Sequence, residues 1–467
     1  MGLWLVVEAG CVSRVVKPGP EEPIFGPGVM KFSEARLIQE RPSQSICSEI
    51  LQLAELPKAT STPMGSAKQK ETPQQKQGVL YYALTDRQCQ ALAAAHAVWG
   101  NILDEESELL VPLVRRQRTP RARSAALQSD LLRYAALAER NRAAADALEL
   151  FYRLAEAEAH WDLCQAALDL IAKARAEKPP GGNWPVSASD SPKSAPAEKE
   201  DSEIQSSPNS PLSEPLASES LEQALQRWQN HQAELNQKIE DLNSQLRAML
   251  GADLGECGRI WPTVTIWVKP ETLDVETAVQ QGLDQRAELR ALRRLLRGID
   301  ANDLSAVRRA LEQWHPALGA TPSRFPAVAQ WLGTAPQHME AATRQLQIRF
   351  LLAYREKEVE EQIRQKARQL QTALAELIQA QARYQAAVRV SGQKIPAGHA
   401  LSPTLSSQPQ TPSPISLQLA IYEAQTALVS RVVAWRIAEV RLMEAMGILA
   451  RQTGYPLPEE AWQPTDL

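Results

Sequence analysis

The sequence is poor in aromatic residues and has neither paired cysteines nor a long apolar run. Aromatic side chains make up 5% of its 467 residues, and phenylalanine occurs only five times. So low an aromatic content does not suit a β-rich core, which favours Val, Ile, Tyr and Phe. The cysteines form no CxxC pair and lie far apart, at positions 11, 47, 89, 164 and 257. We therefore expect neither a zinc site nor a disulfide framework.

Charge and hydropathy exclude two further classes of protein. The formal net charge of −4 is close to neutral, whereas a general nucleic-acid-binding protein has a strongly basic domain. We therefore expect no nucleic-acid partner. No stretch of about 18 apolar residues occurs, so no transmembrane helix is predicted.

No motif for catalysis, phosphate binding or metal binding occurs in the sequence. It contains no GxxxxGK[ST] loop, no GxGxxG loop and no GxSxG elbow. The six histidines are scattered and form no HExxH pair. We therefore predict that the chain is not an enzyme and has no catalytic residue, no cofactor and no metal site.

The first residues resemble part of a bacterial lipoprotein signal. Ala9-Gly10-Cys11 is similar to the end of such a signal, in which the cysteine becomes the lipidated first residue. A secretory signal also needs a basic segment and a longer apolar core, and here Glu8 interrupts the apolar run. Cys11 is therefore a candidate lipidation residue, and the alternative is an ordinary N-terminal tail.

The residues that are abundant favour long helices. Ala, Leu, Gln, Arg and Glu are common, and such residues lose little side-chain freedom in a helix. No proline occurs from 121 to 178, so a helix of about 50 residues is predicted there. Further long helices are predicted from about 218 to Gly251, from about 337 to 390, and from Pro414 to about 450.

Apolar residues on these helices recur at alternating steps of four and three. This is the heptad spacing that keeps one stripe of a helix facing a partner helix in a coiled coil. The last helix carries two apolar stripes, which indicates neighbours on both sides. Heptad-seam packing is predicted for Leu150, Leu154, Trp161, Leu168, Leu225, Trp228, Leu235, Ile239, Leu242, Leu246, Ile363, Leu370, Leu377 and Tyr384.

The order helix, loop, helix, connector occurs twice, and both returning helices close on a glycine, at Gly251 and Gly447. An internal duplication explains this order. The predicted fold class is all-α, with two repeated long antiparallel helical hairpins and little or no β-structure. The predicted organisation is a disordered segment with a lipoprotein-type start at 1–80, a first repeat at 81–300 with a loop at 179–216, a second repeat at 301–450 with a loop at 391–414, and a tail at 451–467.

Shorter elements are predicted between the long helices. A lone strand is expected at Trp261–Val268, one helix at about 274–298 with Asp274 near its start, and another at 303–313. A helical pattern from 85 to 113 is expected to be broken by Pro112 and Pro120. A short helix is expected at 48–55.

Four segments resemble the TolC-type outer-membrane efflux proteins. Segment 137–176 looks like the descending helix of that family, and segment 218–251 is similar to its returning helix, which closes on Leu-Leu-Gly. Leu273-Asp274, followed by Arg286-Ala287-Glu288-Leu289, resembles the opening of the family's second repeat, with Ala287 in place of the usual proline. Segment 415–447 resembles the second returning helix. The resemblance covers about half of the chain.

The chain departs from the family in two segments. Each family repeat has a membrane β-hairpin before its descending helix, and such strands need about 9–11 alternating residues. The corresponding segments, 81–125 and 314–338, are instead interrupted by prolines or helical in pattern. The resemblance is therefore to a divergent member that lacks these hairpins.

The resemblance implies a role in export. It implies a homotrimer in the periplasm or outer membrane, forming a helical duct component of a tripartite efflux or type I secretion system. Its partners would be a periplasmic adaptor and an inner-membrane pump, with attachment to the outer membrane through a lipid anchor or through strands that the pattern does not reveal. Without a signal segment, the chain is expected in the cytoplasm. The alternative function is a coiled-coil scaffold of the cell envelope that transports nothing.

Overall fold

The computed structural model describes residues 37–38, 80–116, 120–176, 221–251, 258–264, 273–299, 304–314, 336–392 and 414–458, together with the single positions 318, 327, 330 and 331. Cys11, the expected helix at 48–55, most of the two predicted loops and most of the C-terminal tail lie outside these ranges. Most of segment 314–338 lies outside them as well, whereas residues 86–116 of the other departing segment are almost entirely helical.

Two helices of equal length dominate the molecule. Helices α4 (Pro120–Ala176) and α11 (Pro336–Gly392) have 57 residues each, so each is about 85 Å long at 1.5 Å per residue. Each begins with a proline, whose fixed φ and missing N–H suit the first helical position. The predicted all-α fold class is confirmed.

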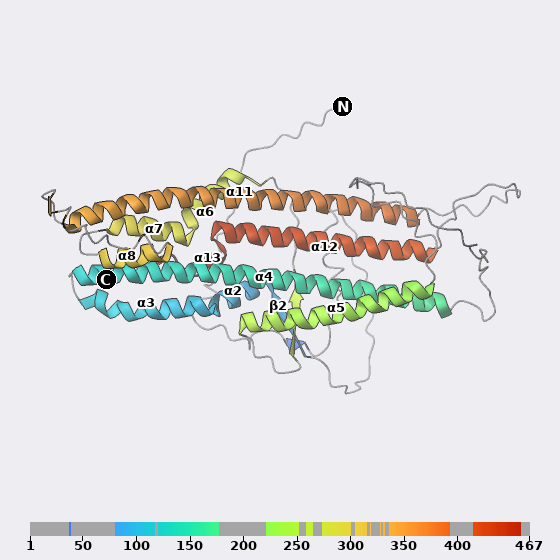
Figure 1. Ribbon diagram of the computed structural model, residues 1–467. Coiled ribbons are helices and arrows are strands. Elements are labelled where there is room, and N and C mark those ends of the chain that lie inside the picture. The colour runs from blue at the N-terminus through green and yellow to red at the C-terminus, as the bar shows by residue number, and fades with distance from the viewer. Residues whose placement is uncertain are drawn as a thin grey trace, which may run out of the picture.

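Each long helix is followed in the sequence by a shorter antiparallel partner. Helix α5 (Leu221–Leu250) returns along α4, and α12 (Pro414–Met446) returns along α11. Helix α12 also packs against α4, so the two apolar stripes of this helix do face two neighbours. Figure 1 shows α11, α12, α4 and α5 lying nearly parallel across an elongated molecule.

The shorter helices differ from the sequence predictions at two places. The segment predicted as one helix at 274–298 forms α6 (Val275–Gln285) and α7 (Ala287–Gly298), because the chain leaves helical geometry at Arg286, where ψ is 122°. Pro112 does not end a helix, since it lies inside α3 (Val98–Arg116). The other short helices are α2 (Asp86–Ala95), α8 (Leu304–Trp314) and α13 (Leu449–Gln452). Asp274 lies at the start of α6 as predicted, and its side chain caps the helix by accepting from the backbone N–H of Thr277.

The strand predicted near Trp261 is not alone. In the described residues, β3 (Gly258–Thr263) pairs in parallel with β2 (Leu80–Thr85), and β1 (Leu37–Ile38) pairs with the other side of β2. Three residues of the segment predicted to be disordered, Leu37, Ile38 and Leu80, therefore take part in the sheet. Pro262 is accommodated because β3 is at the sheet edge, where one side of the strand needs no backbone donor.

The helices form a row of four columns. The first column is α3 continued by α5, the second is α4, the third is α7 continued by α12, and the fourth is α11. Among the described elements, α4 therefore has neighbours on both sides, whereas α11 has neighbours on one side. Buried residues on α11 accordingly follow a narrow stripe. On α4, buried residues cover most of the circumference of the helix, and they include many alanines, Phe151 and Tyr152.

Each composite column has a glycine at its junction. Gly251 ends α5 with φ +60°, and a Cβ there would lie 2.9 Å from Nδ1 of His96, just before α3. Gly447 ends α12 with φ +74°, and a Cβ there would lie 3.2 Å from the Cα of Arg286, just before α7. Both positions need the left-handed backbone and the small volume of glycine. The duplication inferred from the two helix ends is therefore repeated in three dimensions.

We predict that Gly447→Ala lowers the free energy of unfolding by about 1–3 kcal/mol, because alanine is strained at this φ and its methyl group would press on Arg286. The matched control is Gly298→Ala at the end of α7, where the added Cβ meets Leu127 at an ordinary 3.4 Å. Urea denaturation followed by circular dichroism measures both. Equal midpoints for the two variants would contradict the prediction.

Candidate functional site

The fourteen residues predicted for the heptad seams all lie in apolar clusters. Leu154, Trp228, Leu235, Ile239, Leu242, Leu246, Ile363 and Leu377 are buried. The remaining six are partly buried and pack against the same clusters: Leu150, Trp161, Leu168, Leu225, Leu370 and Tyr384. These residues build the inside of each hairpin. The same clusters also join the two hairpins, because the largest of them contains residues of α4, α5, α11 and α12.

The two hairpins meet along α4 and α12, and this contact carries polar side chains along its length. We call it the α4–α12 seam and define it by Asn141, Asp146, Glu149, Tyr152, Glu156 and His160 on α4, with Thr426, Ser430, Arg436, Arg441 and Glu444 on α12. Residue numbers rise on one helix as they fall on the other, because the helices are antiparallel. The seam is the candidate functional site, since any relative movement of the two hairpins must change it.

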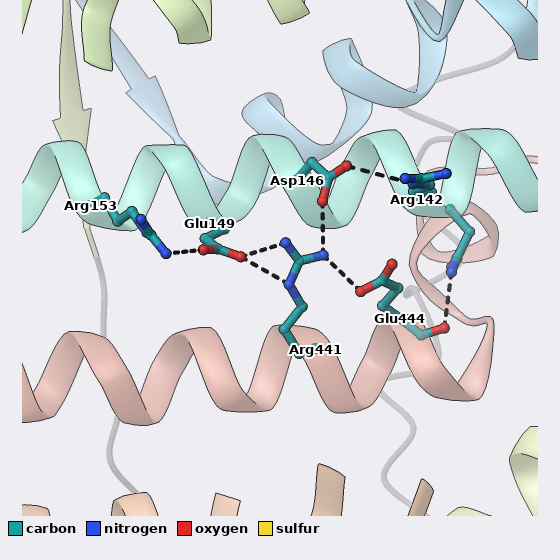
Figure 2. Close-up of polar contacts among 7 residues, drawn as sticks. Arg142, Asp146, Glu149, Arg153, Arg441 and Glu444 are labelled. Atoms are coloured by element: carbon teal, nitrogen blue, oxygen red, sulfur yellow. Dashed lines mark hydrogen bonds and ion pairs between the residues drawn. The ribbon is translucent and has the colours of Figure 1, made fainter. Parts of the chain in front are cut away.

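Arg441 pairs with three carboxylates of the seam. Figure 2 shows its guanidinium reaching from α12 to two carboxylates of α4. It lies 2.8 Å from Asp146 and 2.9 Å from Glu149, and 2.8 Å from Glu444 of its own helix. Burial acts against the charge of Arg441, yet hydrogen bonds to the three carboxylates raise its pKa. Arg441 is the charged group that holds these acids together.

A second cluster lies one to two turns further along. The Tyr152 hydroxyl accepts a hydrogen bond from Nε of Arg436 at 2.9 Å and donates one to Asp86 of α2 at 3.2 Å. Burial raises the pKa of Tyr152, and burial of Arg436 is outweighed by Tyr152 and Glu439, which raise the pKa of the guanidinium. This cluster ties α12 to α4 and to the start of the first repeat.

A third cluster surrounds His160, which is 8% exposed. Its Nε2 lies 3.2 Å from the carbonyl oxygen of Thr426 and 3.2 Å from Oγ of Ser430. The carbonyl can only accept, so Nε2 carries the proton and donates. Ser430 in turn donates to Glu156 at 2.6 Å. The Ser430 hydroxyl therefore donates its hydrogen bond to the Glu156 carboxylate and not to the imidazole. These hydrogen bonds join α4 to α12.

Asn141 closes the end of the seam. Its Nδ2 donates to the carbonyl of Glu444 at 3.0 Å, and its Oδ1 accepts from the backbone N–H of Leu449 at 2.9 Å. The turn between α12 and α13 is thus held by one amide side chain of α4. Asn243 has a similar role in the first hairpin, where its Oδ1 accepts from the N–H of Ile260 at 2.7 Å and so attaches β3 to α5.

Two open grooves lie on the surface of the row. One follows α11 and has a volume of about 770 Å³, and the other lies between α5 and α12 and has a volume of about 810 Å³. The α11 groove is lined by Glu358, Glu361, Gln362, Gln365, Arg368, Gln369, Thr372, Ala373 and Glu376. Trp228, predicted as a seam residue, borders the second groove beside His231.

Within the described part of the chain, no cluster of histidine, cysteine and acidic side chains has the arrangement of a metal site. The same part of the chain contains no helix that is both long and apolar enough to pass through a bilayer.

Cys164 is buried, and its thiol contacts the carbonyl of Trp228 at 3.2 Å. Burial raises the pKa of this thiol to about 11.

No family model and no curated protein matches the sequence. Similar solved structures include the Campylobacter jejuni CmeC outer membrane channel, with 11% identity and a TM-score of 0.48 over 84% of this chain and 93% of the other. The open state of the Neisseria gonorrhoeae MtrE outer membrane channel has 10% identity and a TM-score of 0.48 over 78% and 88%. The outer membrane protein VceC of Vibrio cholerae has 12% identity and a TM-score of 0.40 over 78% and 93%.

These solved structures belong to the class of channel that the sequence resembles. At this level of identity a likeness concerns the fold alone, and at these TM-scores it carries no argument about function.

We predict that replacing Arg441 with methionine lowers the free energy of unfolding by about 1–3 kcal/mol, because three carboxylates lose their shared cation in a partly buried position. The control is Arg431→Met, which removes an ion pair with Glu376 that is about half exposed on both sides. Such an exposed pair contributes about 0–1 kcal/mol. Denaturant midpoints compare the two variants, and an equal loss in both would refute the central role of Arg441.

We predict that stability falls as the pH drops below 6.5 and that His160 is a main cause. Burial lowers the pKa of His160 from its ordinary value of 6.5, while Glu156 acts in the opposite direction and Lys238 and His231 of α5 act with burial. When the pKa of a histidine is lower in the folded than in the unfolded state, its contribution to stability is complete above the unfolded-state pKa. That contribution is lost as the pH falls toward the folded-state pKa.

His160→Gln keeps an N–H donor for Thr426 and should flatten the dependence of the denaturant midpoint on pH between 7 and 5. His338→Gln serves as the control, because His338 is exposed on α11, and should retain the wild-type slope. A wild-type slope in His160→Gln would show that other groups cause the loss.

Proposed function

We propose that the chain is an outer-membrane-efflux-like protein, a wall component of a periplasmic helical duct through which substrates leave the cell. The observation that supports this most is the row of four helical columns. Its contacts between columns are apolar within each hairpin, and it is about 85 Å long. A row of this kind is suited to form a wall and offers no enclosed catalytic pocket among its described residues.

The polar surface of the row fits a water-filled path. The groove along α11 is lined by amides, carboxylates, an arginine and a threonine over more than four turns. Such side chains stay hydrated, so hydrophilic solutes could move past them without the cost of burying unpaired polar groups. We propose this face of α11, together with equivalent faces of the other columns, as the duct lining.

A row with two open sides has to be closed before it can enclose a path. Among the described elements, no helix lies beyond α11 or beyond the column of α3 and α5. We propose that identical copies close the ring, as a homotrimer, and that a periplasmic adaptor and an inner-membrane pump complete the export system. The proposed location is the cell envelope.

The alternative is a coiled-coil scaffold of the envelope that transports nothing. Long antiparallel hairpins and clustered surface charges suit that role equally well. The two functions differ in what happens when the gene is removed, because a scaffold has no direct effect on the intracellular concentration of small solutes.

The experiment compares the source strain with a strain lacking the gene, and measures steady-state accumulation of a panel of fluorescent dyes. We expect at least one dye to accumulate several-fold more in the deletion strain, and the wild-type gene to restore export. Cell fractionation locates the chain in parallel. Unchanged accumulation of every dye, with the chain in the envelope fraction, would favour the scaffold and contradict the duct.

A further inference from the structure

The two open sides of the row carry exposed apolar residues. On α3, the side chains of Val98, Trp99, Ile102 and Leu109 are between 47% and 70% exposed. On α11, those of Leu346, Phe350 and Tyr354 are between 52% and 68% exposed. Large exposed apolar side chains gathered on one face usually mark a contact with another molecule.

The apolar residues on α11 form one stripe. Leu346, Phe350 and Tyr354 are spaced by four residues, so they lie above one another on the same face of the helix. Buried Ile348 and the ion-paired Glu340 and Arg344 lie toward the rest of the row. The stripe therefore faces away from the molecule, at the open side of the fourth column.

The two sides differ in charge. From 98 to 114 the sequence of α3 has four acidic residues and no basic residue, and Glu105 and Glu106 are exposed and form no ion pair with another described residue. From 336 to 357, α11 has two acidic residues, and both are ion-paired within the row: Glu340 is buried against Arg308 and Arg344, and Glu356 pairs with Arg293. Arg349 and Lys357 are exposed beside the apolar stripe. One side is apolar and acidic, and the other is apolar and basic.

The two sides also lie at the same end of the molecule. Ion pairs cross the row there, from Glu108 of α3 to Arg133 of α4, from Asp130 of α4 to Arg294 of α7, and from Arg293 of α7 to Glu356 of α11. Figure 1 shows α3 and the first half of α11 in the same half of the elongated molecule. Two copies placed side by side can therefore bring the acidic side of one to the basic side of the next.

We propose that α11 of one copy packs against α3 of the next copy, with Phe350 and Tyr354 covering the apolar residues of α3 and with Arg349 and Lys357 facing Glu105 and Glu106. This contact joins unlike surfaces, so repeating it closes a ring when the rotation permits. The inference deepens the proposed duct and rests on it for closure of the ring. The contact itself is measurable without transport.

The experiment uses charge reversal in the full-length protein, with sedimentation velocity and native mass spectrometry as readouts. R349E/K357E on α11 should raise the protein concentration needed for assembly at least tenfold. E105K/E106K on α3 should raise it by a similar factor. Combining all four substitutions restores opposite charges across the contact and should restore assembly. Circular dichroism confirms that each variant keeps its helical content.

The control is R297E/R309E, which reverses two exposed arginines of α7 and α8 at the same end of the molecule but away from the open sides. It should assemble as the wild type does. Assembly of R349E/K357E at wild-type strength would overturn the proposed contact. A duct would then have to close through another interface.

Two further outcomes would overturn the contact. A wild-type chain that is monomeric at tens of micromolar would remove both the contact and the ring. A monomer that binds vesicles containing anionic lipid, and loses this binding in R349E/K357E, would assign the basic side of α11 to a lipid surface instead. Charge-dependent assembly in a protein that exports no dye would refute the duct and retain the contact.

Discussion

The burial of α4 on both sides is the constraint on which the rest of the structure depends. Helix α4 packs against α3 and α5 on one side and against α7 and α12 on the other. Small residues make this possible, because Ala144, Ala147, Ala155 and Ala159 are fully buried and allow neighbouring helices to approach closely. If α4 had one apolar stripe, the two repeats would be separate hairpins joined by a connector.

Sequence periodicity predicted the hairpins well because each has a conventional heptad stripe. The fourteen predicted seam residues all pack in apolar clusters. The polar part of the contact between hairpins was not predictable in this way, since it consists of single polar side chains such as Asn141, Arg436 and Arg441. Each of these looks like an ordinary surface residue until its partner on the other helix is known.

The remaining differences also have physical reasons. Leu80–Thr85 was missed as a strand because its partner β3 is about 180 residues away in sequence, and pairing over that separation leaves no local pattern. The break between α6 and α7 at Arg286 was not predicted from the sequence either. The structure breaks there because Gly447 ends α12 against it and because Arg286 donates to the carbonyl of Ala445 at 2.6 Å. The predicted boundary between the two repeats, at residues 300 and 301, stays a prediction.

Cross-linking tests the order of the columns most directly. Glu156 of α4 contacts Ser430 of α12, and Arg431 of α12 pairs with Glu376 of α11, so all three helices are at one level there. With a short bifunctional maleimide, the cysteine pair E156C/S430C should cross-link within one chain and the pair E156C/E376C should not, because α12 lies between α4 and α11. Efficient cross-linking of the second pair would contradict the row.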